Sequence, residues 1–174
     1  YHRPSGKLPM HENWENALML ATGRHVIVLE DKMRLMPGAL RVIEHCLHWH
    51  GDVPVSFGIK FTKHATLPKP MKQPLPSVHY STGLVDRFCR FDQGFFDVLP
   101  RGLNSSVPRE LALEVKRRSA SGYAFSPMSP DYAFGFGLLS HCNYVFHFKE
   151  PLMYVPNNWM WRGMYSNGQA SYTK

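Results

Sequence analysis

Two adjacent carboxylates, Glu30 and Asp31, follow the short apolar run HVIVL and precede Lys32. A run of β-branched residues of this kind is typical of a strand that helices cover on both faces. The two acids would lie at the carboxyl end of that strand, which is where open α/β sheets bind ligands. The sequence therefore places a candidate ligand site here, although an isolated pair of acids at a strand-to-helix turn is also compatible with solvated surface charges.

Asp131 is a second carboxylate in a position that could serve chemistry. It follows Ser129 and Pro130, which suit the N-cap and the first position of a helix. Asp131 would then lie in the first helical turn, where the helix macrodipole favours an acidic side chain without any catalysis. A structural role and a chemical role both remain open for it.

Four potential zinc ligands lie within six residues in the segment EHCLHWH: His45, Cys46, His48 and His50. A helix would bring His45 and His48 to one face, but no second group of ligands at a usual zinc spacing accompanies them. The pattern therefore favours an exposed helix end over a zinc site. The sequence also contains no P-loop, Rossmann glycine motif, GxSxG or HExxH motif.

Alternating helix and strand patterns predict the α/β class of fold and the elements that position these residues. Apolar spacing predicts a helix over residues 13–22 with Gly23 as its left-handed C-cap, a strand over 25–29, and a helix from Pro37 to about His48. The further predicted elements are a strand at 53–62, a proline- and lysine-rich loop at 63–76, a helix capped by Ser106 that Pro108 opens and Gly122 ends, a helix beginning at Pro130, and a β-hairpin or two linked strands over 143–155.

Composition predicts one globular domain over residues 1–174. The chain is 44% hydrophobic, 13% aromatic and 19% charged, and disordered chains have fewer aromatic residues and more charge. No apolar run approaches the roughly 20 residues of a membrane-spanning helix, and residues 1–10 lack the apolar core of a secretory signal. We therefore expect no transmembrane segment.

Charge and cysteine content narrow the expected partners and compartment. The formal net charge of +7 favours an anionic partner, such as a nucleotide, an acidic glycan, a nucleic acid or a lipid headgroup. Cys46, Cys89 and Cys142 are odd in number and have no CxxC spacing, which favours reduced thiols and a cytoplasmic location.

The order of several motifs resembles a known enzyme family. The segments NWENALMLATGRHVIVLEDKMRLMPGAL, SPDYAFGFGLLSHCNYVFHFKEPLMYV and YSNGQAS are similar, in this order, to the second half of a family 2 glycosyltransferase with the GT-A fold. The resemblance extends from about Glu12 to the end and is weakest from about Lys60 to Phe96. It implies a partial GT-A mixed sheet flanked by helices.

The resemblance also implies an activity, a cofactor and roles for particular residues. Such an enzyme transfers a sugar from a nucleotide-sugar donor to the hydroxyl of a glycan or other acceptor, and Mg²⁺ or Mn²⁺ neutralises the leaving diphosphate. Asp131 would be the general base of an inverting reaction. The resemblance implies that Glu30 and Asp31 bind the metal. It also implies that the donor is bound by Asn13, Trp14, Glu30, Asp31, Lys32, Arg162 and Asn167.

The chain departs from the family pattern in two ways. Lys32 stands where a third acid would complete the acidic motif, and adjacent side chains at a strand end point to opposite faces. The similarity also begins after the strands that bind the nucleobase in GT-A enzymes. A domain without those strands would have an exposed sheet edge that favours self-association. The alternative is a non-catalytic binding or assembly module that recognises an anionic glycan, a partner protein or nucleic acid.

Overall fold

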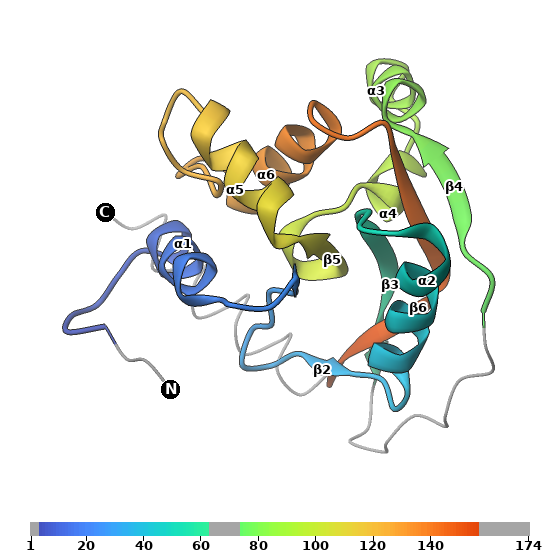
Figure 1. Cartoon of the computed structure of the whole chain (residues 1–174), viewed down its shortest axis with the longest axis horizontal. Helices are drawn as coiled ribbons and strands as arrows, with labels where there is room; N and C mark the ends of the chain where they lie inside the picture. The colour runs from blue at the N-terminus through green and yellow to red at the C-terminus, as the bar shows by residue number, and fades with distance from the viewer. Residues whose placement is uncertain (1–3, 63–73, 157–174) are drawn as a thin grey trace.

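The sheet of this protein is mixed and has six strands. The computed structural model describes residues 4–62 and 74–156 (Figure 1). The strand order is β1-β5-β3-β6-β2, and β4 also pairs with β6; β3 and β6 are parallel, and the other pairs are antiparallel. The strands are β1 His25–Val26, β2 Arg34–Leu35, β3 Val55–Thr62, β4 Ser77–Tyr80, β5 Ser105–Pro108 and β6 Tyr144–Pro156.

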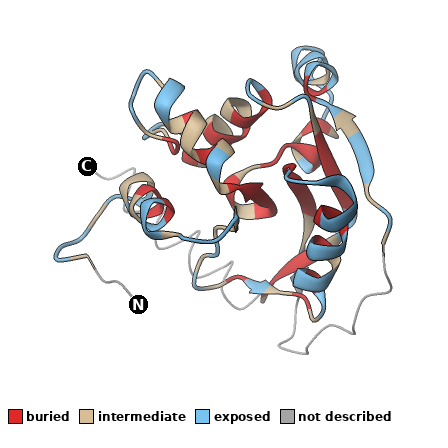
Figure 2. Cartoon of the chain, viewed as in Figure 1, coloured by how far each residue is buried: buried red, intermediate tan, exposed pale blue. Residues whose placement is uncertain are grey.

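Helices cover this sheet and form its hydrophobic cores, which confirms the α/β class. One core lies between α2 and strands β3 and β6, a second joins α1, α5 and α6 beside β5, and a third lies among α3, α4 and α6. Buried residues accordingly concentrate along β3, β5 and β6 (Figure 2). The helices are α1 Met10–Leu20, α2 Ala39–His50, α3 Ser81–Cys89, α4 Phe95–Val98, the 3₁₀ turn η1 Gly102–Asn104, α5 Arg109–Arg118 and α6 Pro130–Leu139.

β6 is one continuous strand of 13 residues, so the predicted hairpin or pair of linked strands is wrong. The Lys-Glu-Pro segment at 149–151 indicates a turn in isolation, but it passes through the sheet as a bulge opposite Gly58 of β3. A Cβ atom on Gly58 would lie 3.0 Å from the carbonyl oxygen of Lys149, so the close approach of the two backbones requires a glycine. The bulge therefore keeps β3 and β6 paired on both sides of it.

The strand predicted over residues 25–29 is shorter and less covered than expected. β1 contains only His25 and Val26, both half-buried, and Leu29 is 47% exposed. In the described part of the chain, β5 is the strand that pairs with β1, so the other edge of β1 has no strand beside it. Val26 and Val28 pack against one hydrophobic core and Ile27 packs against another, so both faces are covered as predicted, but only in part, because these residues are half-buried.

Two prolines predicted to begin helices lie just before the helices instead of inside them. Residue Gly38, with a φ of 86°, precedes α2, so Pro37 lies outside the helix. Ser106 is buried within β5, and Pro108 is the residue just before α5, so the predicted cap at Ser106 is wrong. Gly122 has a φ of 71° and lies beyond the end of that helix.

Two other helix ends test the sequence predictions. α6 begins at Pro130 directly after Ser129, as predicted, although the Ser129 side chain makes no capping hydrogen bond to the described residues. α1 begins at Met10 and ends at Leu20, followed by the extended residue Ala21. The predicted left-handed C-cap at Gly23 is therefore wrong. The predicted strand at 53–62 is confirmed as β3, and residues 63–73 of the predicted loop lie outside the described residues.

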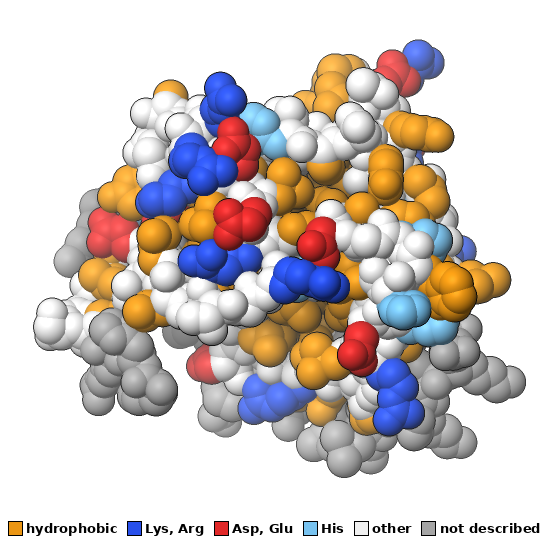
Figure 3. Space-filling view, viewed as in Figure 1, with side chains coloured by type: hydrophobic (Ala, Val, Ile, Leu, Met, Phe, Trp, Pro, Cys, Tyr) orange, Lys and Arg blue, Asp and Glu red, His pale blue; other side chains and the backbone are white. Residues whose placement is uncertain are grey.

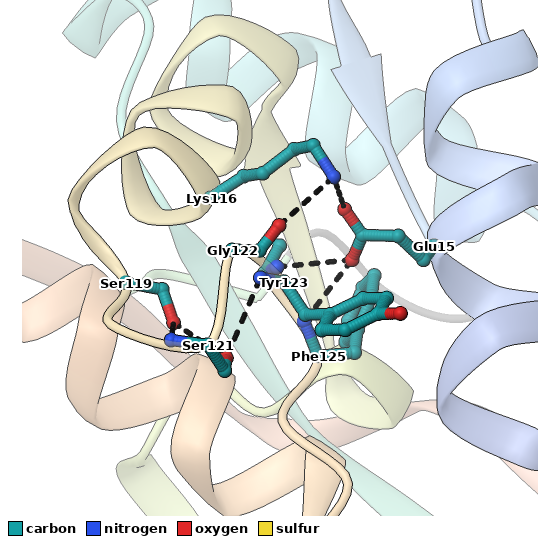
Figure 4. A network of polar contacts seen from close by, with 8 residues as sticks. Glu15, Lys116, Ser119, Ser121, Gly122, Tyr123 and Phe125 are labelled. Carbon is teal, nitrogen blue, oxygen red and sulfur yellow. Dashed lines mark hydrogen bonds and ion pairs between the residues drawn. The ribbon is translucent and has the colours of Figure 1, made fainter.

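A buried carboxylate fixes α1 to the rest of the protein. Glu15 is only 6% exposed, and its Oε1 atom lies 2.6 Å from Nζ of Lys116 on α5. Its Oε2 atom accepts hydrogen bonds from the backbone N–H groups of Ala124 at 2.9 Å and Phe125 at 3.3 Å. Lys116 also donates to the carbonyl oxygen of Gly122 (Figure 4). One side chain thus links α1, α5 and the loop before α6.

Replacing this carboxylate by an amide tests the link. We expect Glu15→Gln to lower the free energy of unfolding by about 2 kcal/mol, because it removes the negative charge that faces a partly buried ammonium. Urea denaturation measures the change. Glu114→Gln is the matched control, because Glu114 pairs with Arg117 and Arg118 on the surface of α5 and should matter much less. An equal loss of stability in Glu15→Gln and Glu114→Gln would show that the buried ion pair stabilises the protein no more than the surface pairs do.

Candidate functional site

A cleft of about 860 Å³ separates α1 from the segment that follows β1. Most of its lining side chains are apolar. The polar ones are His25 of β1, Glu30 and Asp31 farther along the chain, and Asn13 of α1. It is the roomiest of the clefts among the described residues that lie next to predicted site residues. Its lining residues are Leu8, Met10, Asn13, Trp14, Ala17, Leu18, Ala21, Phe125 and residues 25–31.

Four of the predicted donor-binding residues lie on this one cleft: Asn13, Trp14, Glu30 and Asp31. Asn13 is exposed on α1, whereas Trp14 is only 8% exposed and packs edge-to-face on Phe125 at 5.4 Å between ring centroids. Trp14 is therefore mainly a core residue that forms part of the cleft wall. Gly102 lies beside the same two rings, since a Cβ atom there would be 3.3 Å from Phe125 and 3.5 Å from Trp14.

The acidic segment forms a turn that its own side chains stabilise. The N–H group of Met33 donates to the carbonyl oxygen of Glu30 at 2.9 Å. Nζ of Lys32 lies 2.8 Å from Oε2 of Glu30. The guanidinium of Arg34 donates to the backbone carbonyl oxygens of Asp31 and Met33, at 2.5 and 2.8 Å. The Lys32 ammonium therefore lies against the Glu30 carboxylate, and the Arg34 guanidinium lies against the backbone of Asp31.

These residues fit a divalent cation poorly. Within residues 4–62 and 74–156, no three His, Cys, Asp or Glu side chains come together as a metal-binding group. Glu30 already pairs with the Lys32 ammonium, which would repel Mg²⁺ or Mn²⁺ bound to the same carboxylate. Asp31 is exposed and would remain as the one carboxylate without such a neighbour. The donor set therefore lacks the concentration of negative charge that the sequence resemblance implies.

The remaining predicted residues are not brought to this cleft by the described structure. Asp131 lies in the first turn of α6 and is half-buried, and it does not line the cleft. Arg162 and Asn167 lie outside the described residues, as do the C-terminal aromatic residues near them. The site thus consists of the α1 side and the turn at residues 30–34.

The predicted zinc ligands are separated by burial. His45 and His48 are exposed on α2, where each lies edge-on to the ring of Trp49. Cys46 is buried on the opposite side, and burial raises the pKa of its thiol to about 11. A buried, protonated thiol does not bind zinc, which requires the thiolate. The expectation of an exposed helix end is consistent with this arrangement.

Sequence reasoning missed a polar link across the sheet at the start of β1. Nε2 of His25 lies 3.3 Å from a carboxylate oxygen of Asp52, and Nδ1 lies 3.3 Å from Oγ of Ser106. Ser106 is 1% exposed, and burial lowers the pKa of His25. The three residue types could suggest nucleophilic catalysis, but a substrate must reach the serine. We interpret the link as structural, since it joins β1, β5 and the segment before β3.

A second missed group is a histidine pair where β4 meets β6. Nδ1 of His147 lies 3.0 Å from Oγ of Ser56, and its ring lies edge-on to that of His79. Burial, and to a smaller extent the positive charges of His79 and Arg87, lower the pKa of His147 to about 4, although Asp97 and Glu150 oppose the shift. His147 is therefore neutral in the folded protein at neutral pH.

Charges on the surface are largely paired, which limits any polyanion-binding face. In Figure 3, Lys and Arg side chains lie next to Asp and Glu side chains across the visible face. Arg24 pairs with Asp52 at 3.0 Å, and Arg109 pairs with Glu110 at 3.1 Å. A uniform basic surface of the kind that non-specific nucleic-acid binding uses is not visible on this face.

No protein-family model matches the chain, and no curated protein sequence gives a significant match. Nor do the described residues include a helix that is both long and apolar enough to cross a membrane. The cleft beside α1 and the residues that line it are therefore the features from which a function can be inferred.

The lowered pKa of His147 makes the stability of the folded protein depend on pH. An unfolded histidine titrates near pH 6.5 and the folded one near 4, so between these values the unfolded state binds the extra proton. Stability is then fully present above pH 6.5 and falls as the pH drops to 4, by about 3 kcal/mol at most from this group.

The measurement is urea denaturation of the wild type and His147→Gln at pH 7, 5.5 and 4. We expect the variant to lose less stability than the wild type over this range, whatever its stability at pH 7. His48→Gln, which changes an exposed histidine of α2, is the control and should keep the wild-type pH dependence. Identical pH dependence in wild type and His147→Gln would contradict the assignment.

Proposed function

We propose that this chain is the C-terminal portion of a GT-A glycosyltransferase domain. In this proposal it transfers a sugar from a nucleoside-diphosphate donor to a hydroxyl acceptor, with inversion at the anomeric carbon. The observation that supports it is the cleft beside α1, on which Asn13, Trp14, Glu30 and Asp31 lie together. The resemblance to family 2 glycosyltransferases predicts that these four residues bind the donor.

The free edge of β1 is consistent with this proposal. Among the described strands only β5 pairs with β1, and Val26, Ile27 and Val28 are half-buried although their apolar character suits a covered strand. Further strands beside β1 would pair with this edge, and their side chains would extend the two apolar faces on which these residues lie. In the resembled enzymes such strands bind the nucleobase. The same polypeptide, a partner chain or a second copy could supply them.

The proposed reaction assigns donor binding to the cleft and proton removal to Asp131, which lies outside the cleft in the first turn of α6. The acceptor hydroxyl attacks the anomeric carbon, its proton passes to the Asp131 carboxylate, and the bond to the nucleoside diphosphate breaks on the opposite face of the sugar. The turn at residues 30–34 would face the diphosphate, where negative charge develops as this bond breaks. Attack opposite to the leaving group inverts the anomeric configuration.

A nucleotide panel tests donor binding. We expect one of UDP, GDP and CDP, at 100 times its dissociation constant, to stabilise the chain by about 2.7 kcal/mol and to raise its melting temperature by about 5 °C or more. The panel is measured with Mn²⁺ and with EDTA. Asn13→Ala should weaken the shift, whereas Asn16→Ala should not, because Asn16 is on the same helix but does not line the cleft. No shift with any nucleotide in either condition would overturn the proposal.

Asp131 is tested by turnover. With the sugar donor of the nucleotide that binds, we expect Asp131→Asn to slow transfer by about 10²-fold or more, because the base is lost, while nucleotide affinity stays the same. Glu110→Gln is the matched control, since Glu110 also lies in the first turn of a helix. Normal turnover of Asp131→Asn would leave this carboxylate only its interaction with the helix macrodipole.

A further inference from the structure

The turn at residues 30–34 contains as many positive charges as negative ones. Its two acids are Glu30 and Asp31, and its two cations are Lys32 and Arg34. The Glu30–Lys32 pair is formed directly, at 2.8 Å, with 21% of the Glu30 side chain and 42% of the Lys32 side chain exposed. Lys32 is therefore the more exposed side chain of the pair. Lys32 does not itself line the cleft, but its partner Glu30 does.

This charge balance favours an anion over a divalent cation. A site for Mg²⁺ or Mn²⁺ needs an excess of anionic oxygen to offset the loss of hydrating water. Here the Glu30 carboxylate is already bound to the Lys32 ammonium. The guanidinium of Arg34 is held against the backbone carbonyl of Asp31. An ammonium has three N–H donors, so Lys32 can keep its contact with Glu30 and still donate to a phosphate oxygen.

We propose that Lys32 takes the place of a divalent cation and binds the diphosphate of the nucleotide, so that donor binding in this protein does not require a metal. The inference rests on the proposed function, because it concerns the same donor site. Glu30 is then a positioning residue that directs the ammonium toward the cleft. Lys32 would also stabilise the charge that the diphosphate gains as it leaves.

Calorimetric titration with the nucleotide selected by the panel tests the inference. For the wild type we expect dissociation constants in EDTA and in Mn²⁺ that agree within about twofold. Lys32→Ala should weaken binding about tenfold or more in both conditions, as the loss of a charged hydrogen bond predicts. Lys32→Asp should abolish binding in EDTA and restore it in Mn²⁺, since three consecutive acids would then attract a cation.

The matched control is Lys149→Asp, which makes the same change of charge at an exposed lysine on β6. Lys149 does not line the cleft. Its neighbour Phe148 pairs with Phe57, and Tyr154, whose partner on β2 is Arg34, pairs with Lys60, so three residue steps of β3, or roughly 10 Å, separate Lys149 from the turn. This variant should bind the nucleotide as the wild type does. An equal loss in Lys149→Asp would show that overall charge, and not Lys32, governs affinity.

The outcomes separate the inference from the function on which it rests. Wild-type binding that occurs only with Mn²⁺ overturns the role of Lys32 and leaves the glycosyltransferase proposal intact. This arm needs no variant, so it decides the question even if a substitution at position 32 prevents folding. Absence of binding with and without Mn²⁺ overturns the proposed function and the inference together.

Discussion

The buried carboxylate of Glu15 determines where α1 lies, and the candidate site depends on that position. Without the ion pair to Lys116 and the two backbone hydrogen bonds, α1 would be attached mainly by the apolar packing of Trp14 and Leu18 and by the contact of His11 with Tyr123. An ionised group inside a protein is costly unless its partners are in place. Its presence therefore selects one arrangement of α1 against α5 and the loop before α6. That arrangement forms the helical wall of the cleft.

The opposite wall is fixed by pairing with strands at its two ends. β1 pairs with β5, and β2 pairs with the distal part of β6, so the turn at residues 30–34 lies between two anchored strands. Hydrogen bonds within the turn then orient its charges. The cleft is thus made of one wall set by a buried ion pair and another set by the sheet. Short strands suffice because each is paired with a more deeply buried neighbour.

Sequence patterns predicted what local chemistry determines. The start of α6 follows from Ser129 and Pro130, and β3 follows from its own apolar content. Non-local partners determine what was missed. The segment at 149–151 becomes part of β6 because Gly58 lies opposite it, and Ser106 becomes a strand residue because β5 pairs with β3.

The same distinction applies to the site. Asn13, Trp14, Glu30 and Asp31 could be predicted because the motif that contains them is continuous along the chain. Gly102 and Phe125, which complete the wall beside Trp14, come from distant segments without a motif. The spacing of Lys32 and Glu30 in the sequence permits an ion pair, but only the structure shows that the pair is formed. Local sequence thus predicted four residues that line the cleft, and tertiary contacts determine its shape and its charge.

The position of β6 in the middle of the sheet also has a kinetic consequence. This last strand pairs with β2, β3 and β4 and contributes to two hydrophobic cores. Its parallel pairing with β3 joins residues such as Ser56 and His147, which are 91 positions apart. Closing so long a loop costs chain entropy before the paired strands can compensate for it. An unpaired edge of β3 can pair with other chains, so the slow closure of this loop exposes the folding chain to aggregation.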